Sequence, residues 1–327
     1  MAELKVEPIE SYALSKEIRV KTLFSKIGVV GCGIEGQSIA RISSWYGIEV
    51  VLVGKDADCF EEAKEGISEE LDRRIENWGL TPSEKRAIMG RIKGSVECSD
   101  LKDCDFVIEA IPSDQETGKR DLNERKRIFR EIEKVVSDDA IIATNASTIV
   151  ITELASELKI RERTASLHFF TASPEAKIVE VVRGHYTSDE VYEKVCQFAK
   201  LNNREVIPVE ESAGIVSMRL FVVLLNEACY TLMEGVASMR DIDKTLEIGL
   251  GMRVGPFHSA DFIGLEKVVT WMENLYEEFG QLKYKPAPLL KRFVRAKRLG
   301  RHTGAGFYKY DDNGNIIAED FVAKKIG

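Results

Sequence analysis

The stretch Lys26–Gly36, which reads KIGVVGCGIEG, decides the fold that this sequence predicts. An apolar run typical of a short buried strand leads into a Gly-x-Gly-x-x-Gly turn and then into a helical pattern. Gly31 permits the tight turn, Gly33 lets the backbone approach a pyrophosphate, and Gly36 allows close packing of helix on strand. The first turn of the helix, beginning at Ile34, offers unpaired N–H groups to phosphates. The stretch therefore predicts a dinucleotide site.

The rest of the first half alternates strand and helix patterns. Apolar runs of strand length lie at residues 49–53, 105–110 and 140–144. After the first of these runs, two helical patterns predict an inserted hairpin, whose second helix begins with a capping box formed by Thr81 and Glu84. This alternation is typical of a parallel, doubly wound sheet.

Residues at the strand ends complete the predicted cofactor site. Ligands of parallel sheets bind beyond the carboxyl ends of the strands. We therefore expect Gly31, Gly54, Ala110 and Ser147 to surround one crevice. Lys55, Ile111 and Asn145 are further candidates for binding the cofactor.

From about Val206 the pattern predicts helices only. They are expected at residues 214–233, 241–250, 260–279 and 287–298. The prediction is an α/β N-terminal Rossmann-like doubly wound sheet with an inserted helical hairpin, plus an all-α C-terminal dimerisation domain. Its divisions are an N-terminal extension (1–25), a dinucleotide-binding domain (26–208) and a helical substrate and dimerisation domain (209–327).

Composition limits the function classes. The chain has 327 residues, 44% of them hydrophobic and 31% charged, which is typical of a soluble globular protein. A formal net charge of −8 argues against a nucleic-acid partner. The six cysteines form no Cys-x-x-Cys pair, so we expect free thiols, no metal site and a reducing, cytoplasmic location. We also expect no membrane span, because no apolar run reaches about eighteen residues.

A second group of residues indicates acid–base chemistry. His168, one of four histidines, lies in the segment LHFF, and Glu180 follows twelve residues later inside the apolar segment IVEVV. A buried glutamate needs a partner, and an imidazole held by a carboxylate can act as acid or base. A buried structural histidine near an unrelated glutamate is the alternative that these residues alone leave open.

Taken together, the motifs resemble the 3-hydroxyacyl-CoA dehydrogenase family, including its short-chain 3-hydroxybutyryl-CoA members. They run in order from about Lys26 to Tyr310: the glycine-rich turn, VIEAIP (107–112), NAS (145–147), HFF (168–170), IVEVV (178–182), GP (255–256), ADFIGL (260–265) and G-x-GFY (304–308). The resemblance implies a two-domain homodimer that oxidises an (S)-3-hydroxyacyl-CoA with NAD(H). It also implies that His168 is the general base, that Glu180 orients it, and that Ser147 binds the substrate oxygen.

One departure from the family pattern concerns substrate binding. The family carries Gly-x-x-x-Asn-Arg at the start of a long helix, and this chain carries Met218 at the asparagine position. Methionine cannot donate the amide hydrogen bond to the substrate oxygen. Ser217 lies about 100° around the helix and could substitute for the asparagine only if the helix were rotated or shifted.

A second departure concerns the adenosine ribose. The acidic residue expected after the second strand is replaced by Gly54, and Lys55 follows it. Loss of the carboxylate and gain of a cation favour binding of the 2′-phosphate of NADP(H). Alternatively, Asp56 takes over the ribose contact.

A third departure lies after the next strand, where Ser113 replaces a family glutamate. The loop that follows contains Lys119 and Arg120, which could reach a phosphate or remain solvated.

The main interpretation is therefore an NAD(P)-dependent 3-hydroxyacyl-CoA dehydrogenase. The first alternative is a dehydrogenase of a free hydroxy acid or sugar acid. An alternative of another class is a non-catalytic, crystallin-like structural or binding relative. The retained Ser147, His168 and Glu180 count against this last view, and Met218 counts for it.

Overall fold

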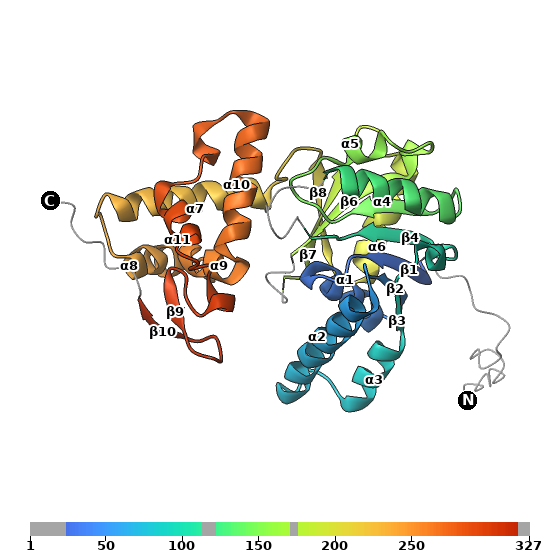
Figure 1. Ribbon diagram of the computed structural model, residues 1–327, viewed down its shortest axis with the longest axis horizontal. Coiled ribbons are helices and arrows are strands. Elements are labelled where there is room, and N and C mark those ends of the chain that lie inside the picture. The colour runs from blue at the N-terminus through green and yellow to red at the C-terminus, as the bar shows by residue number, and fades with distance from the viewer. Residues whose placement is uncertain (1–23, 113–121, 171–175, 320–327) are drawn as a thin grey trace, which may run out of the picture.

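Eight strands form one twisted sheet at the centre of the N-terminal part of the chain (Figure 1). The computed structural model describes residues 24–112, 122–170 and 176–319. The strand order is β3-β2-β1-β4-β5-β6-β7-β8. All neighbouring strands are parallel except β6 and β7, which are antiparallel. Their bounds are β1 Lys26–Val30, β2 Glu49–Val53, β3 Ile92–Ser95, β4 Phe106–Glu109, β5 Ile141–Thr144, β6 Thr164–Phe169, β7 Ile178–Arg183 and β8 Glu205–Glu210.

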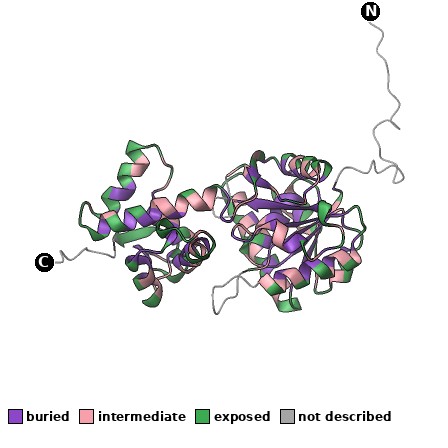
Figure 2. Cartoon of the chain, turned by 90° about the horizontal axis from the view of Figure 1, so that it is seen from above, coloured by how far each residue is buried: buried purple, intermediate pink, exposed green. Residues whose placement is uncertain are grey.

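Helices cover both faces of this sheet. One face packs against α1, α2, α3 and α6, and the other packs against α4 and α5. The strands are largely buried, and the helices expose their outer sides (Figure 2). The bounds are α1 Ile34–Trp45, α2 Ala57–Glu76, α3 Pro82–Gly90, α4 Leu122–Val135, α5 Ile151–Ala155 and α6 Asp189–Leu201.

The remaining helices form a separate lobe with its own apolar core (Figure 1). Their bounds are α7 Ser217–Met233, α8 Met239–Lys244, α9 Pro256–Ile263, α10 Leu265–Phe279 and α11 Pro288–Arg295. A short antiparallel pair, β9 Tyr308–Tyr310 and β10 Ile316–Glu319, closes the described chain. The predicted fold class, a doubly wound sheet with an inserted helical hairpin followed by a helical lobe, is confirmed, although the lobe also carries the β9–β10 pair.

Several local predictions are also confirmed. The strand, turn and helix that begin at Lys26 form as expected, and Thr81 and Glu84 make the reciprocal hydrogen bonds of a capping box. A side chain at Gly36 would place Cβ 1.8 Å from the carbonyl oxygen of Gly31, so the close packing of α1 on β1 requires this glycine. All six cysteines are free thiols.

Other local predictions are wrong. The pattern after Val206 is not purely helical, because residues 205–210 form β8 at the edge of the sheet. The helix expected over 260–279 is two helices, since the chain breaks at Gly264 with φ +105°. The helix expected over 241–250 is α8 followed by a π-helical turn at Thr245–Gly249.

Candidate active site

The antiparallel pairing of β6 and β7 brings His168 and Glu180 together. The two residues are direct cross-strand partners, and Nδ1 of His168 lies 2.8 Å from Oε2 of Glu180. The histidine is 8% exposed and the glutamate 2% exposed. The other ring nitrogen, Nε2, has no hydrogen-bond partner among the described residues. A carboxylate on one ring nitrogen fixes the tautomer and leaves the other nitrogen as an acid or base.

The start of α7 holds the glutamate from its other side. Oε1 of Glu180 accepts hydrogen bonds from the backbone N–H groups of Val216 (3.2 Å) and Ser217 (2.9 Å). The Ser217 hydroxyl donates to Oε2 at 2.7 Å. Burial alone would raise the pKa of Glu180, but the hydrogen bonds from His168 and Ser217 outweigh it and hold this pKa below its usual value. The carboxylate is therefore charged at neutral pH although it is buried.

A left-handed turn aims these N–H groups. Gly214 has φ +77° and Ile215 has φ +43°. Positive φ at a β-branched residue is rare and costs energy, so it indicates a constrained functional turn. The Gly214 N–H also donates to the carbonyl oxygen of Ser147 at 2.8 Å, which joins this turn to the end of β5.

The structure therefore links the three predicted catalytic residues and Ser217, which was predicted to bind substrate. Ser147, His168, Glu180 and Ser217 are joined through β5, β6, β7 and the start of α7. The Ser147 hydroxyl makes no hydrogen bond with a described residue, whereas the Ser217 hydroxyl is used by Glu180. Met218 follows on α7, partly buried.

The glycine-rich turn fits a bound dinucleotide. No side chain caps the start of α1, so the N–H groups of its first turn, from Ile34 onward, remain available. A Cβ built at Gly33 would find its nearest neighbour 4.0 Å away, so the space in front of this turn is open. The N–H of Ala110 donates to the carbonyl oxygen of Val30, and the N–H of Ile111 donates to the carboxylate of the buried Glu109. These bonds fix the end of β4 next to the glycine-rich turn.

The ribose end of this site has an unusual local packing. A Cβ at Gly54 would lie 2.9 Å from Sγ of Cys32, so the sulfur fills the space that an acidic residue would need. Asp56 caps α2 by accepting from the N–H of Cys59 at 2.8 Å. Lys55 is exposed, and its Nζ lies 3.8 Å from Asp56.

Two buried polar links support the site, and the sequence motifs alone do not indicate them. Asn145 donates to Oε2 of Glu35 at 2.7 Å and accepts from the N–H of Phe169 at 3.0 Å, so it joins α1 to the strand end beside His168. The fully buried Glu109 accepts from Thr144 and pairs with Arg125 on α4. The carboxylate of Glu35 within the glycine-rich turn is the sequence signal that could have indicated the first link.

A cavity of about 390 Å³ lies between the two lobes. It is lined by α1 and α2 on one side and by α9 and α10 on the other, with Glu35, Arg41, Arg73, Lys267 and Trp271 among its residues. It opens beside the first turn of α1, so it provides room for a ligand next to the dinucleotide site.

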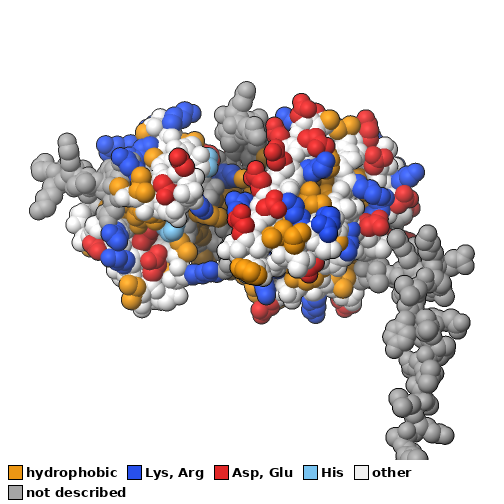
Figure 3. Space-filling model, turned by 90° about the horizontal axis from the view of Figure 1, so that it is seen from below, with side chains coloured by type: hydrophobic (Ala, Val, Ile, Leu, Met, Phe, Trp, Pro, Cys, Tyr) orange, Lys and Arg blue, Asp and Glu red, His pale blue; other side chains and the backbone are white. Residues whose placement is uncertain are grey.

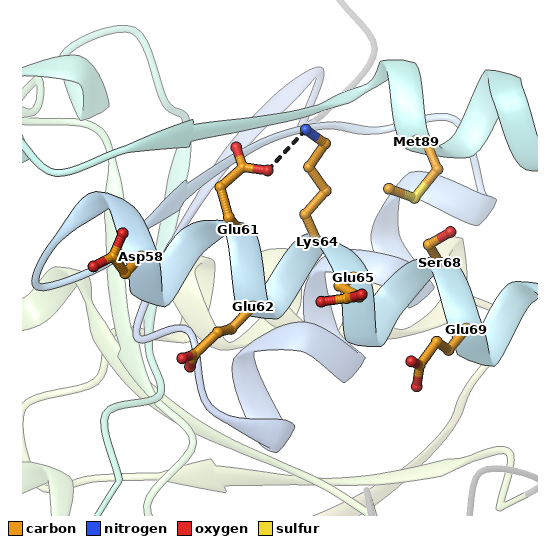
Figure 4. A pocket seen from close by; sticks show the side chains of 8 residues that line it. All are labelled: Asp58, Glu61, Glu62, Lys64, Glu65, Ser68, Glu69 and Met89. Atoms are coloured by element: carbon orange, nitrogen blue, oxygen red, sulfur yellow. Dashed lines mark hydrogen bonds and ion pairs between the residues drawn. The ribbon is translucent and has the colours of Figure 1, made fainter.

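A second, shallower hollow lies on the outer side of α2 (Figure 4). Five carboxylates line it, and Lys64, its one cation, is paired with Glu61. Such a surface repels a phosphate-bearing ligand. On the face seen in Figure 3, acidic and basic side chains are interspersed over the larger lobe and form no extended basic surface.

Ser113, Lys119 and Arg120 lie outside the described residues. Within the described ranges, no group of three or more His, Cys, Asp or Glu side chains is placed to hold a metal ion. No helix within the same ranges has the length and apolarity to cross a membrane.

Comparison with known proteins identifies two matching family profiles. The profile "3-hydroxyacyl-CoA dehydrogenase, NAD binding domain" matches residues 26–212. The profile "3-hydroxyacyl-CoA dehydrogenase, C-terminal domain" matches residues 214–310. Together they span the sheet and the helical lobe.

Individual relatives agree with these profiles. A probable 3-hydroxybutyryl-CoA dehydrogenase of Deinococcus radiodurans is 36% identical over 285 residues, covering 87% of this chain and 100% of its own length. The 3-hydroxybutyryl-CoA dehydrogenase of Clostridioides difficile is 33% identical over 286 residues, covering 88% and 99%. The crystal structure of the (S)-3-hydroxybutyryl-CoA dehydrogenase of Ralstonia eutropha is similar, with a TM-score of 0.79, 36% identity, and coverage of 88% of this chain and 100% of that one.

Proposed function

The chain belongs to the 3-hydroxyacyl-CoA dehydrogenase family, and on that premise we propose how it acts as an NAD-dependent oxidoreductase that interconverts an (S)-3-hydroxyacyl-CoA and a 3-ketoacyl-CoA. The observation that carries this proposal is the buried pair of His168 and Glu180, 2.8 Å apart, at the end of the sheet where Asn145 links the strand beside His168 to the start of α1. The runner-up, a dehydrogenase of a free hydroxy acid, has weaker support because the most similar relatives are named for CoA thioesters.

Each residue of the pair has a distinct role. A bound nicotinamide supplies the hydride acceptor or donor. His168 takes the proton of the substrate hydroxyl on Nε2 during oxidation and returns it during reduction. Glu180 fixes the ring through Nδ1 and stabilises the imidazolium that forms. Ser147, whose hydroxyl is not engaged by a described residue, donates to the substrate oxygen.

The residues of the glycine-rich turn hold the cofactor. Gly31 forms the tight turn, Gly33 leaves room for the pyrophosphate beside the backbone, and Gly36 lets α1 pack on β1. The uncapped first turn of α1 would hold the pyrophosphate. Gly54 offers no carboxylate to the ribose, and Asp56 already uses Oδ1 to cap α2 while its Oδ2 lies 3.8 Å from Nζ of Lys55. We therefore propose that this NAD(H) enzyme also accepts NADP(H).

Ser217 acts as a positioning residue in this proposal. Its hydroxyl proton is directed at Glu180, so it does not replace the missing amide at Met218 as a donor to the substrate. Stabilisation of the negative charge that develops on the substrate oxygen then depends on Ser147 and His168.

We propose three further properties. The helical lobe forms a homodimer, because α7 and the turn after it expose large apolar side chains: Leu220, Tyr230, Met233 and Val236. The protein acts in the cytoplasm, where its six free thiols stay reduced. The division into residues 1–25, 26–208 and 209–327 describes its extension, dinucleotide-binding and substrate parts.

An absorbance assay tests the proposal. Acetoacetyl-CoA and acetoacetate are each supplied with NADH or NADPH. A sugar acid of the gulonate type is supplied with NAD or NADP. We expect turnover of the CoA thioester and little turnover of the free acids. Turnover of a free acid but not of the thioester would show that the substrate is a free acid. A His168→Ala variant with the wild-type rate would overturn the catalytic assignment.

A further inference from the structure

Two arginines are buried on the α1 and α6 side of the sheet without a carboxylate partner. Arg41 lies on α1 and is 6% exposed, and Arg204 precedes β8 and is 9% exposed. Within the described ranges, Arg41 makes no hydrogen bond and no ion pair. The one side-chain hydrogen bond of Arg204 there is long, from Nη1 to the carbonyl oxygen of Asn203 at 3.4 Å. Two largely buried cationic groups thus lie without a carboxylate partner among the described residues.

Both arginines line one small cavity. Its volume is about 10 Å³, so it has room for one small group. Ser38, Ile42, Phe169, Phe170 and Ala176 complete its lining. Ser38 and Arg41 also line the larger cavity between the lobes, so a small solute can reach this place from there.

The neighbouring charges do not neutralise this pair. Glu70 is the acidic residue whose charge acts on Arg41, but it is already engaged by Arg73 at 3.1 Å and Arg74 at 3.3 Å. Burial, together with the charge of Arg74, lowers the pKa of Arg41 to about 10, so the guanidinium is still cationic at neutral pH. A buried charge without a counter-charge is strongly destabilising.

We propose that Arg41 and Arg204 form a binding site for a small monovalent anion, of the size of chloride or formate, in the cavity behind the carboxyl end of β6. The cavity is too small for a phosphate group, and the hydroxyl of Ser38 offers a third donor. The anion supplies the counter-charge that the protein lacks. It joins α1, the end of β6 and the start of β8 beside Phe170, whose ring lies 5.2 Å from that of His168. The site does not depend on the proposed reaction.

Thermal unfolding of the full chain tests the proposal. The midpoint Tm is measured in sodium chloride and in sodium gluconate at equal ionic strength, because gluconate is too large for the cavity. A ligand that binds the folded state raises Tm with its concentration, and a rise of roughly 2–4 °C or more is expected for chloride over gluconate. Sodium formate in a third arm distinguishes a halide from a carboxylate as the ligand. Identical Tm values in all three salts would overturn the proposal.

Two variants and a matched control locate the effect. Arg41→Gln and Arg204→Gln should each abolish the difference between chloride and gluconate. Arg127→Gln removes the same charge from an exposed ion pair on α4 and should keep the difference. A difference that survives in both cavity variants would overturn the proposal.

A crystal experiment on the unmodified protein decides the matter even if the variants fail to fold. Crystals grown in sodium bromide should show an anomalous peak between the guanidinium groups of Arg41 and Arg204. Ordered bromide elsewhere, with none in this cavity, would contradict the assignment.

Discussion

Replacing Glu180 by glutamine is the sharpest perturbation of the proposed site, because it keeps the shape and removes only charge and acceptor capacity. Four hydrogen bonds converge on the carboxylate, two on each oxygen. A glutamine keeps its oxygen on the two backbone N–H groups only if its NH₂ group faces the Ser217 hydroxyl and Nδ1 of His168, which must then accept instead of donate. Hydrogen bonds to a charged carboxylate, each worth about 1.5–3 kcal/mol, are replaced by weaker neutral ones, and the histidine is held in the other tautomer.

The catalytic loss follows from the same geometry. Without the carboxylate, the imidazolium of His168 loses its counter-charge and the neutral ring is held in the other tautomer. Loss of a general base costs about 10²–10⁴ in rate, and we expect Glu180→Gln to lower kcat for acetoacetyl-CoA reduction by roughly 10² or more. The dissociation constant of NADH, measured by fluorescence, should stay near wild type because Glu180 does not contact the glycine-rich turn in the described structure.

The matched control is Glu211→Gln. Glu211 accepts from the N–H of Thr152 at 2.6 Å and from its hydroxyl at 2.5 Å, so the same chemistry is lost away from His168. This variant should lose stability and keep its kcat. If Glu180→Gln retained more than a tenth of the wild-type kcat, the assigned role of the pair would be refuted.

Stability against pH gives an independent readout of Glu180. Its folded pKa lies below the usual 4.5, so its ionised form stabilises the folded state above that pH, and this contribution is lost as the pH falls through the folded value. The Glu180→Gln variant lacks this titration. Its free energy of unfolding, compared with wild type in urea, should therefore differ most at neutral pH and less in acid.

Three further predictions concern other sites. Gly54→Asp alone should destabilise the protein, because the new side chain would contact Cys32. The double variant Cys32→Ala, Gly54→Asp should fold and raise the preference for NADH over NADPH, measured as kcat/KM, roughly tenfold. A single variant that is stable and shows the same shift would contradict the packing argument. Met218→Asn should raise kcat on acetoacetyl-CoA roughly tenfold, and unchanged turnover in a stable variant would point to another substrate. Gly306→Ala would place Cβ 2.0 Å from Oδ1 of Asp261 and should lower Tm by several degrees, which calorimetry can measure; an unchanged Tm would show that the segment does not depend on this contact.

The sequence predicts the parts of the molecule that rest on local signals. The glycine pattern at Gly31–Gly36 follows from the steric needs of a tight turn, and it forms as expected. β8 is harder to recognise because Pro208 interrupts it, yet proline is tolerated there since β8 lies at the sheet edge. β3 has little apolar signal, as Gly94 is kept small by the ring of Phe60. The break at Gly264 requires a positive φ that no periodicity reveals.

The candidate site shows the same limit. The spacing of His168 and Glu180 indicates two strands, but their register, which makes them direct partners, is set by tertiary pairing. The role of Ser217 could not be predicted, because it depends on how α7 meets β7. The link between Glu35 and Asn145 joins residues 110 positions apart in the chain, and no local pattern relates them.

The start of α7 therefore does more than connect the two lobes. Its two N–H groups and the Ser217 hydroxyl supply three of the four hydrogen bonds to Glu180, and they come from the end of the helix where the dipole is positive. The same turn is tied to Ser147 through Gly214. A shift of the helical lobe that moved α7 away would remove these three bonds together, leaving a buried carboxylate held by His168 alone. The ionised state of Glu180, and with it the carboxylate that orients the ring of His168, is thus coupled to the position of one lobe relative to the other.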